Sequence, residues 1–167
     1  MKRTVSVIGL IIGTILSANT IVMMNRMYTD PDFKGNDILG YAAMVALFSL
    51  IFVGVRNYRN KHLDGFISFG NAFKIGAWIA FVASTIYVIL GLSYYYLMVP
   101  DFIEVYVQYI LKHTPPAELQ ARTAEMENFK EMYKNPLFAI LISYFEVLPV
   151  GLLVALVSAW IVKKKSN

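Results

Sequence analysis

The 167-residue chain contains no cysteine, and only 16% of its residues are charged. Without cysteine, neither a disulfide framework nor a thiolate metal site can form. The two histidines, His62 and His113, have no ligand spacing around them, and no nucleophile-elbow, P-loop or zinc-protease signature occurs. We therefore expect a protein that is not an enzyme and that holds no metal and no cofactor.

Basic residues outnumber acidic ones by 15 to 11, which gives a formal net charge of +4. A basic excess can indicate nucleic-acid binding, but that function needs a basic stripe on a soluble element. The cations of this chain instead cluster between apolar segments. We therefore expect no nucleic-acid partner.

Apolar residues make up 57% of the chain and are concentrated in long runs. The runs cover residues 5–24, 38–55, 75–99 and 137–162. A helix needs about 20 apolar residues to cross the hydrocarbon core of a bilayer. The sequence therefore predicts an all-α, integral membrane four-helix bundle, formed as a single domain by residues 1–167 and embedded in the lipid bilayer. A helical segment at residues 100–136 is predicted outside the membrane, between spans three and four.

The N-terminus has two readings. Met1-Lys2-Arg3 and the apolar run after it resemble a signal peptide with a small-residue site at Ser17-Ala18. The run continues to Met24, however, which is long for a signal-peptide core of roughly 7–15 residues. An uncleaved first span is the favoured reading.

The Lys and Arg residues of the loops predict the orientation. One side carries nine cations: Lys2, Arg3, Arg56, Arg59, Lys61, Lys74, Lys163, Lys164 and Lys165. The other side carries six: Arg26, Lys34, Lys112, Arg122, Lys130 and Lys134. Because cytoplasmic loops carry the excess, we expect a multi-pass protein of the cell inner membrane with both termini in the cytoplasm.

The connections carry their own signals. The short link at residues 25–37 predicts that spans one and two pack as antiparallel neighbours. Phe66, Phe69 and Phe73 have helical spacing, which fits either an interfacial helix or the first turns of span three.

In the outer segment, Thr114-Pro115-Pro116 predicts a cap that opens a second helix. The apolar stripes of these two outer helices could lie against each other, the bundle, lipid or a partner.

Small residues recur at intervals of four in three spans. They are Gly9, Gly13 and Ser17; Gly76, Ala80 and Ser84; and Gly151, Ala155 and Ala159. Helices in lipid associate through close backbone approach, which such stripes permit. The stripes predict packing inside one bundle or, alternatively, a face for a homo-oligomer or a larger membrane complex.

Glu146 is the one acidic residue well inside a predicted span, and a charge at that depth is costly. We expect it to face the bundle interior, where it either pairs or stays protonated. Pro149 cannot donate to the carbonyl of Phe145, so the helix should open beside the carboxyl group. Candidate neighbours of similar depth are Asn19 or Thr20 of the first span and Tyr87 or Thr85 of the third. The group is a proton or ligand site or, alternatively, a protonated carboxyl hydrogen-bonded across the bundle.

Several stretches together resemble one family. They are residues 65–74, 126–130, 133–138 and 146–152. The resemblance is to domain of unknown function 4199, a family of small membrane proteins seen mainly in the Bacteroidetes group. It implies a four-span bacterial inner-membrane protein without an assigned activity, and it carries over no catalytic residues.

Two functional hypotheses remain from the sequence. The first is a non-enzymatic accessory or interaction protein that binds itself or a larger membrane complex. It depends on the small-residue faces, the amphipathic outer helices and the missing catalytic chemistry. The second is a small transporter or proton-coupled carrier centred on Glu146. Several polar side chains converging on Glu146 would favour the second hypothesis.

Overall fold

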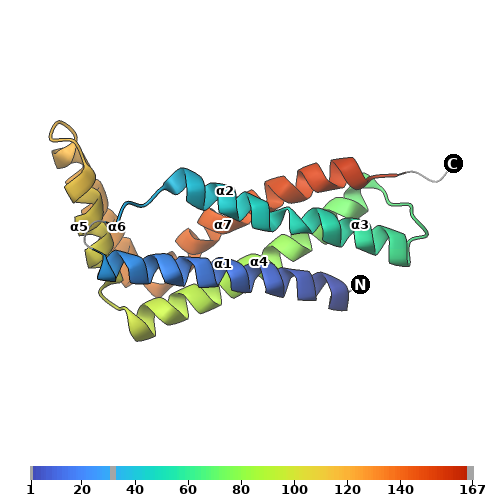
Figure 1. Ribbon diagram of the computed structural model, residues 1–167, viewed down its shortest axis with the longest axis horizontal. Helices are drawn as coiled ribbons and strands as arrows, with labels where there is room; N and C mark the ends of the chain where they lie inside the picture. The colour runs from blue at the N-terminus through green and yellow to red at the C-terminus, as the bar shows by residue number, and fades with distance from the viewer. Residues whose placement is uncertain (1, 31–32, 165–167) are drawn as a thin grey trace.

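The computed structural model describes residues 2–30 and 33–164, and it shows a bundle of long helices capped at one end (Figure 1). The helices are α1 Lys2–Thr29, α2 Asp37–Phe48, α3 Leu50–His62, α4 Phe69–Met98, α5 Phe102–His113, α6 Leu119–Lys134 and α7 Pro136–Val162. Within these described ranges there is no β-strand, only a single bridge between Ile67 and Lys164. The all-α prediction is therefore confirmed.

Four helical segments are long and apolar enough to cross a membrane: Val5–Thr29, Ile38–His62, Phe69–Met98 and Pro136–Val162. Each is longer than the apolar run that predicted it, because helical hydrogen bonding continues into polar flanks. At the end of α1, for example, Asn25 and Thr29 bond to the carbonyls of the preceding turn. The α4 helix begins at Phe69, where the Ser68 side chain caps it.

The second span is two helices, which the apolar pattern did not predict. Helix α2 ends at Phe48 and α3 begins at Leu50. At the junction, the Ser49 hydroxyl donates to the carbonyl of Ala46 at 2.6 Å. Bonding of a serine to the preceding turn competes with the helical ladder and commonly bends a helix.

Helix α4 is central and packs along both α1 and α7. Gly9 contacts Val82 and Gly13 contacts Ile86, so α1 and α4 run parallel. The α1 helix packs less extensively against α2 and α3 than against α4. The first two spans are therefore in contact, but they are not the closest pair. The short link fixes their order along the chain, but the glycines of α1 permit closer approach to α4.

Helix α7 runs antiparallel to α4. Gly76 lies against Ala155, and Gly151 lies against both Ala80 and Phe48. Phe48 is fully buried at this contact. The centre of the bundle is therefore closed by small residues of α4 and α7 with one large aromatic ring from α2.

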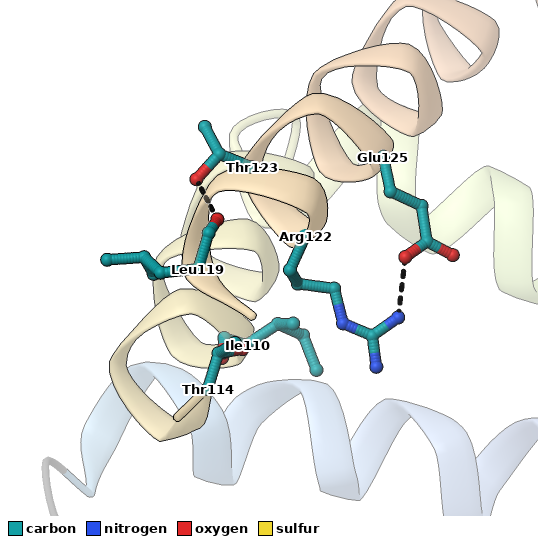
Figure 2. Close-up of polar contacts among 6 residues, drawn as sticks. All are labelled: Ile110, Thr114, Leu119, Arg122, Thr123 and Glu125. Carbon is teal, nitrogen blue, oxygen red and sulfur yellow. Dashed lines mark hydrogen bonds and ion pairs between the residues drawn. The ribbon is translucent and has the colours of Figure 1, made fainter. Parts of the chain in front are cut away.

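The α5–α6 hairpin lies across the end of the bundle remote from both termini (Figure 1). The second helix begins at Leu119, four residues after the predicted start at Pro115. Thr114 instead caps the C-terminal end of α5, and the carbonyl of Pro115 accepts a hydrogen bond from the amide of Glu118 in the turn. Figure 2 shows the tip of the hairpin, where Arg122 donates to Glu125 at 2.7 Å.

The apolar stripes of the two outer helices lie against each other and against the bundle. Tyr106 of α5 contacts Phe129 of α6, with ring centroids 5.9 Å apart. Phe102 contacts Tyr28 of α1, and Tyr133 contacts Tyr95 of α4. Glu104 and Lys130 add an ion pair of 2.9 Å between the two helices. The hairpin therefore docks on the bundle.

At the opposite end, the α3–α4 loop is attached to the end of α7. Ile67 and Lys164 exchange two backbone hydrogen bonds of 2.9 Å, and Arg59 donates to the carbonyl of Val162. Phe69 and Phe73 stack within the first turns of α4, whereas Phe66 precedes the helix. Of the two readings of this aromatic stretch, the structure therefore supports the first turns of span three.

Candidate intramembrane site

Glu146 lies on α7, ten residues after the helix begins at Pro136, and its side chain is exposed. This corrects the expectation that it faces the bundle interior. The buried arc of α7 is formed by Ser143, Val147 and Gly151. Successive helical residues are separated by about 100°, so Glu146 falls at the flank of this arc. The sequence does not show which residues of an almost wholly apolar helix form the buried arc.

The Glu146 groove is a hollow of about 500 Å³ on the half of the bundle that carries α5 and α6. Its walls come from α7, the start of α2 and the end of α6. They are formed by Tyr41, Met132, Phe138, Leu141, Ile142, Phe145 and Glu146. Phe145 is 77% exposed at its rim. Because almost all of these residues belong to candidate spans, the groove opens sideways, toward the surroundings of the bundle.

Three tyrosines lie in the neighbourhood of Glu146, although none of them donates a hydrogen bond to its carboxyl group. Tyr41 lies in the same groove, and the charge of Glu146 acts on both Tyr87 and Tyr133. Burial, reinforced by that negative charge, raises the pKa of Tyr133 to about 12. Tyr133 is therefore a neutral hydroxyl at physiological pH. Sequence reasoning missed Tyr133 because this residue lies on a different helix, outside the apolar runs.

The predicted neighbours of Glu146 divide into two groups. Tyr87 is buried and interacts with the Thr20 hydroxyl of α1. Thr85 instead accepts a hydrogen bond of 2.9 Å from Tyr144. Asn19 lies on α1, and its side chain is exposed. The structure therefore joins Tyr87 to the surroundings of Glu146 and places Asn19 on an exposed face.

The Glu146 carboxyl group has no partner inside the described part of the chain. No residue there donates a hydrogen bond to it or forms an ion pair with it. A carboxylate without compensation is costly in a medium that cannot hydrogen-bond. Stabilisation of this group must therefore come from protonation or from outside the chain.

Pro149 lies inside α7, three residues beyond Glu146, and is exposed. The helix continues through it from Pro136 to Val162. Proline has no N–H, so the carbonyl of Phe145 loses its usual amide donor. This carbonyl adds a second incompletely bonded acceptor near the groove.

All nine residues of the small-residue stripes are buried. A Cβ atom on Gly76 would lie 2.9 Å from that of Ala155, and one on Gly151 would lie 2.9 Å from that of Ala80. The Ser17 hydroxyl bonds to the carbonyl of Gly13. Ser84 is fully buried, and its hydroxyl has no hydrogen-bond partner in the described structure. These stripes are therefore used for contacts within the chain.

The described residues contain no group of three or more metal-binding side chains. His62 ends α3 and His113 ends α5, at opposite ends of the bundle.

Four helical segments that are long and apolar enough to cross a membrane are typical of a multi-pass helical membrane protein. Residues 8–164 match the family model described as "Protein of unknown function (DUF4199)". The match covers nearly the whole chain, so the chain belongs to this family and the resemblance seen in the sequence is confirmed. No curated protein and no solved structure matches the chain.

Proposed function

We propose that the protein is a non-enzymatic interaction protein that binds another membrane component through the Glu146 groove. The observation that carries the proposal is an exposed carboxyl group in an apolar groove, without a partner inside the described chain. A charged Asp, Lys or Arg at mid-membrane costs about 2.5–3.5 kcal/mol on insertion scales, and a charged Glu belongs to the same class. A donor supplied by a partner offsets this cost.

The proposal does not depend on the small-residue stripes or on the apolar faces of the outer helices. Both are used in packing within the chain. The groove is different because its walls are both apolar and exposed. It can bind a partner without any change in the packing of the core.

We propose that the groove lies on the outer half of a protein of the bacterial inner membrane, with both termini in the cytoplasm. The cations Arg56, Arg59, Lys74 and Lys163 support this orientation. Arg56 and Arg59 lie in the second half of α3, Lys74 lies near the start of α4 and Lys163 directly follows α7. These helix ends lie at the end of the bundle that is remote from α5 and α6 (Figure 1). Cytoplasmic loops carry the excess of Lys and Arg.

The experiment is site-specific photocross-linking in the host membrane. A photoreactive residue replaces Phe145 at the rim of the groove, and a matched variant carries it at Leu153. Leu153 is on the same helix and 64% exposed but lies outside the groove. The proposal expects one discrete protein adduct at position 145 and none at 153. Equal labelling at both positions, or lipid adducts alone, would remove it.

A proton-coupled carrier is the second candidate, favoured by the three tyrosines around Glu146. It expects a pH-dependent flux in liposomes that Glu146→Gln abolishes while the helical content stays unchanged. The tight contacts in the other half of the bundle, such as Gly76 against Ala155, favour the interaction protein. A loss of folding in Glu146→Gln would instead assign the carboxyl group a structural role.

A further inference from the structure

We infer that the occupant of the Glu146 groove is a transmembrane helix of a different protein that presents a Lys or Arg side chain to Glu146. This inference rests on the proposed function and specifies the chemistry of its partner. It depends on three properties of the groove: the depth of the carboxyl group, the sign of its charge and the chemistry of the walls.

The depth follows from the position of Glu146 in α7. Ten residues separate it from Pro136. At about 1.5 Å per residue this is roughly 15 Å along the helix. The hydrocarbon core is about 30 Å thick, so a helix that enters it at Pro136 carries Glu146 about half-way across. Lipid headgroups do not reach this depth, whereas a side chain on another spanning helix does.

The negative charge of an ionised Glu146 is stabilised by a cationic partner. A second copy of this chain does not supply a cation at the same depth. Lys and Arg in the described spans all lie within about two turns of a span end. Arg26 lies near the end of α1, Lys74 lies near the start of α4 and Arg56 lies in the second half of α3. None of them matches the depth of Glu146. Ionisable residues inside membranes characteristically pair with one another, so the complementary cation belongs to another protein.

The walls suit a helix with a long cationic side chain. Phe138, Leu141 and Phe145 recur at intervals of three and four, which forms a continuous ridge along α7. Opposite this ridge, the ring of Tyr41 lies in the same groove as Glu146. Aromatic faces attract Lys and Arg cations, most strongly where water is absent. A volume of about 500 Å³ has room for such a side chain beside the ridge.

Synthetic transmembrane peptides test this pairing directly. The probe is a leucine-rich helix of about 21 residues with one central Lys, mixed with the full-length protein in phosphatidylcholine vesicles. Matched peptides carry Leu or Glu at the central position, and association is measured by fluorescence energy transfer. We expect the Lys peptide to bind about tenfold more tightly than the Leu peptide, and the Glu peptide to bind least.

Protein variants show whether Glu146 causes this preference. Glu146→Gln keeps the shape of the side chain and should remove the preference for Lys. Asn19→Leu removes another exposed intramembrane polar group and should leave the preference unchanged. As a measurement that needs no protein variant, a peptide whose Lys is moved two turns from the centre should bind wild-type protein no better than the Leu peptide.

Equal binding of the Lys and Leu peptides to wild-type protein would overturn the inference. A preference that persists in Glu146→Gln would overturn it as well. Energy transfer between copies of the protein that disappears in Glu146→Gln would make a second copy the occupant instead. If cross-linking at position 145 yields a protein adduct while the peptides show no Lys preference, the interaction protein stands and the cationic partner does not. If the peptides show the Lys preference but cross-linking at position 145 yields no protein adduct, the groove does select a cation, and the proposed function is wrong.

Discussion

A Cβ atom on Gly13 would lie 2.5 Å from the carbonyl oxygen of Ala83. The neighbouring atom belongs to the backbone, so it cannot rotate away as a flexible side chain can. Gly13 therefore fixes how closely α1 approaches α4, and a larger residue must separate the two helices.

Gly13→Ala is expected to destabilise the protein by about 1–3 kcal/mol, because overpacking forces a backbone shift. The measurement is the free energy of unfolding in mixed detergent micelles. Gly91→Ala is the matched control on α4, since a Cβ there meets nothing within 4 Å. It should be neutral or stabilising, because alanine favours helix over glycine. Equal destabilisation of both variants would contradict the assigned contact.

The outer hairpin is attached to α1 by a hydrogen bond of 2.6 Å from the Tyr28 hydroxyl to an oxygen of Asp101. Tyr28→Phe should weaken this attachment by about 0.5–1.5 kcal/mol. Hydrogen exchange of α5 and α6 amides should accelerate, while that of α4 stays unchanged. In a double-mutant cycle, Asp101→Asn should add little once Tyr28 has been changed. Fully additive effects would show that the two side chains act independently.

The Glu104–Lys130 pair joins the two helices of the hairpin, and it lowers the pKa of Glu104. A carboxyl with a lowered folded-state pKa stabilises the fold above its unfolded value of about 4.3, and this contribution is lost as pH falls through the folded value. Both side chains are substantially exposed, so Glu104→Gln should cost only about 0.2–1 kcal/mol at pH 7. The difference from wild type should shrink as the pH falls below the unfolded pKa of about 4.3, and it should disappear once the pH is below the lowered pKa of the folded state. A difference that persists in acid would assign Glu104 a role other than charge.

The absence of cysteine makes orientation directly measurable, because one introduced thiol reacts alone. Ala117→Cys lies in the turn between α5 and α6, and Asn60→Cys lies near the end of α3. A membrane-impermeant thiol reagent should label position 117 in intact spheroplasts, and position 60 only after permeabilisation. The opposite pattern would invert the predicted topology.

The sequence predicted those features that depend on composition along the chain. Apolar runs located four candidate spans, and spacing of small residues located the contacts of Gly13 and Gly76. The break at Ser49 could not be predicted, because it arises from one hydroxyl bond within an otherwise apolar run.

The prediction that Glu146 faces the bundle interior was wrong for a different reason. Both the buried and the exposed faces of a membrane helix are apolar, so the pattern of α7 does not show which side faces the bundle. The buried side is set by contacts such as Gly151 with Ala80, which only the folded structure reveals. The participation of Tyr133 likewise depends on how α6 folds back toward α7.

The most direct measurement of the central claim is native mass spectrometry of the tagged protein, extracted with lipid from its own host membrane. The account predicts a second protein in stoichiometric amount with wild type and with Asn19→Leu, and its loss in Glu146→Gln. A bare monomer or homo-oligomer in all three samples would contradict a partner protein in the Glu146 groove and would favour the proton-coupled carrier.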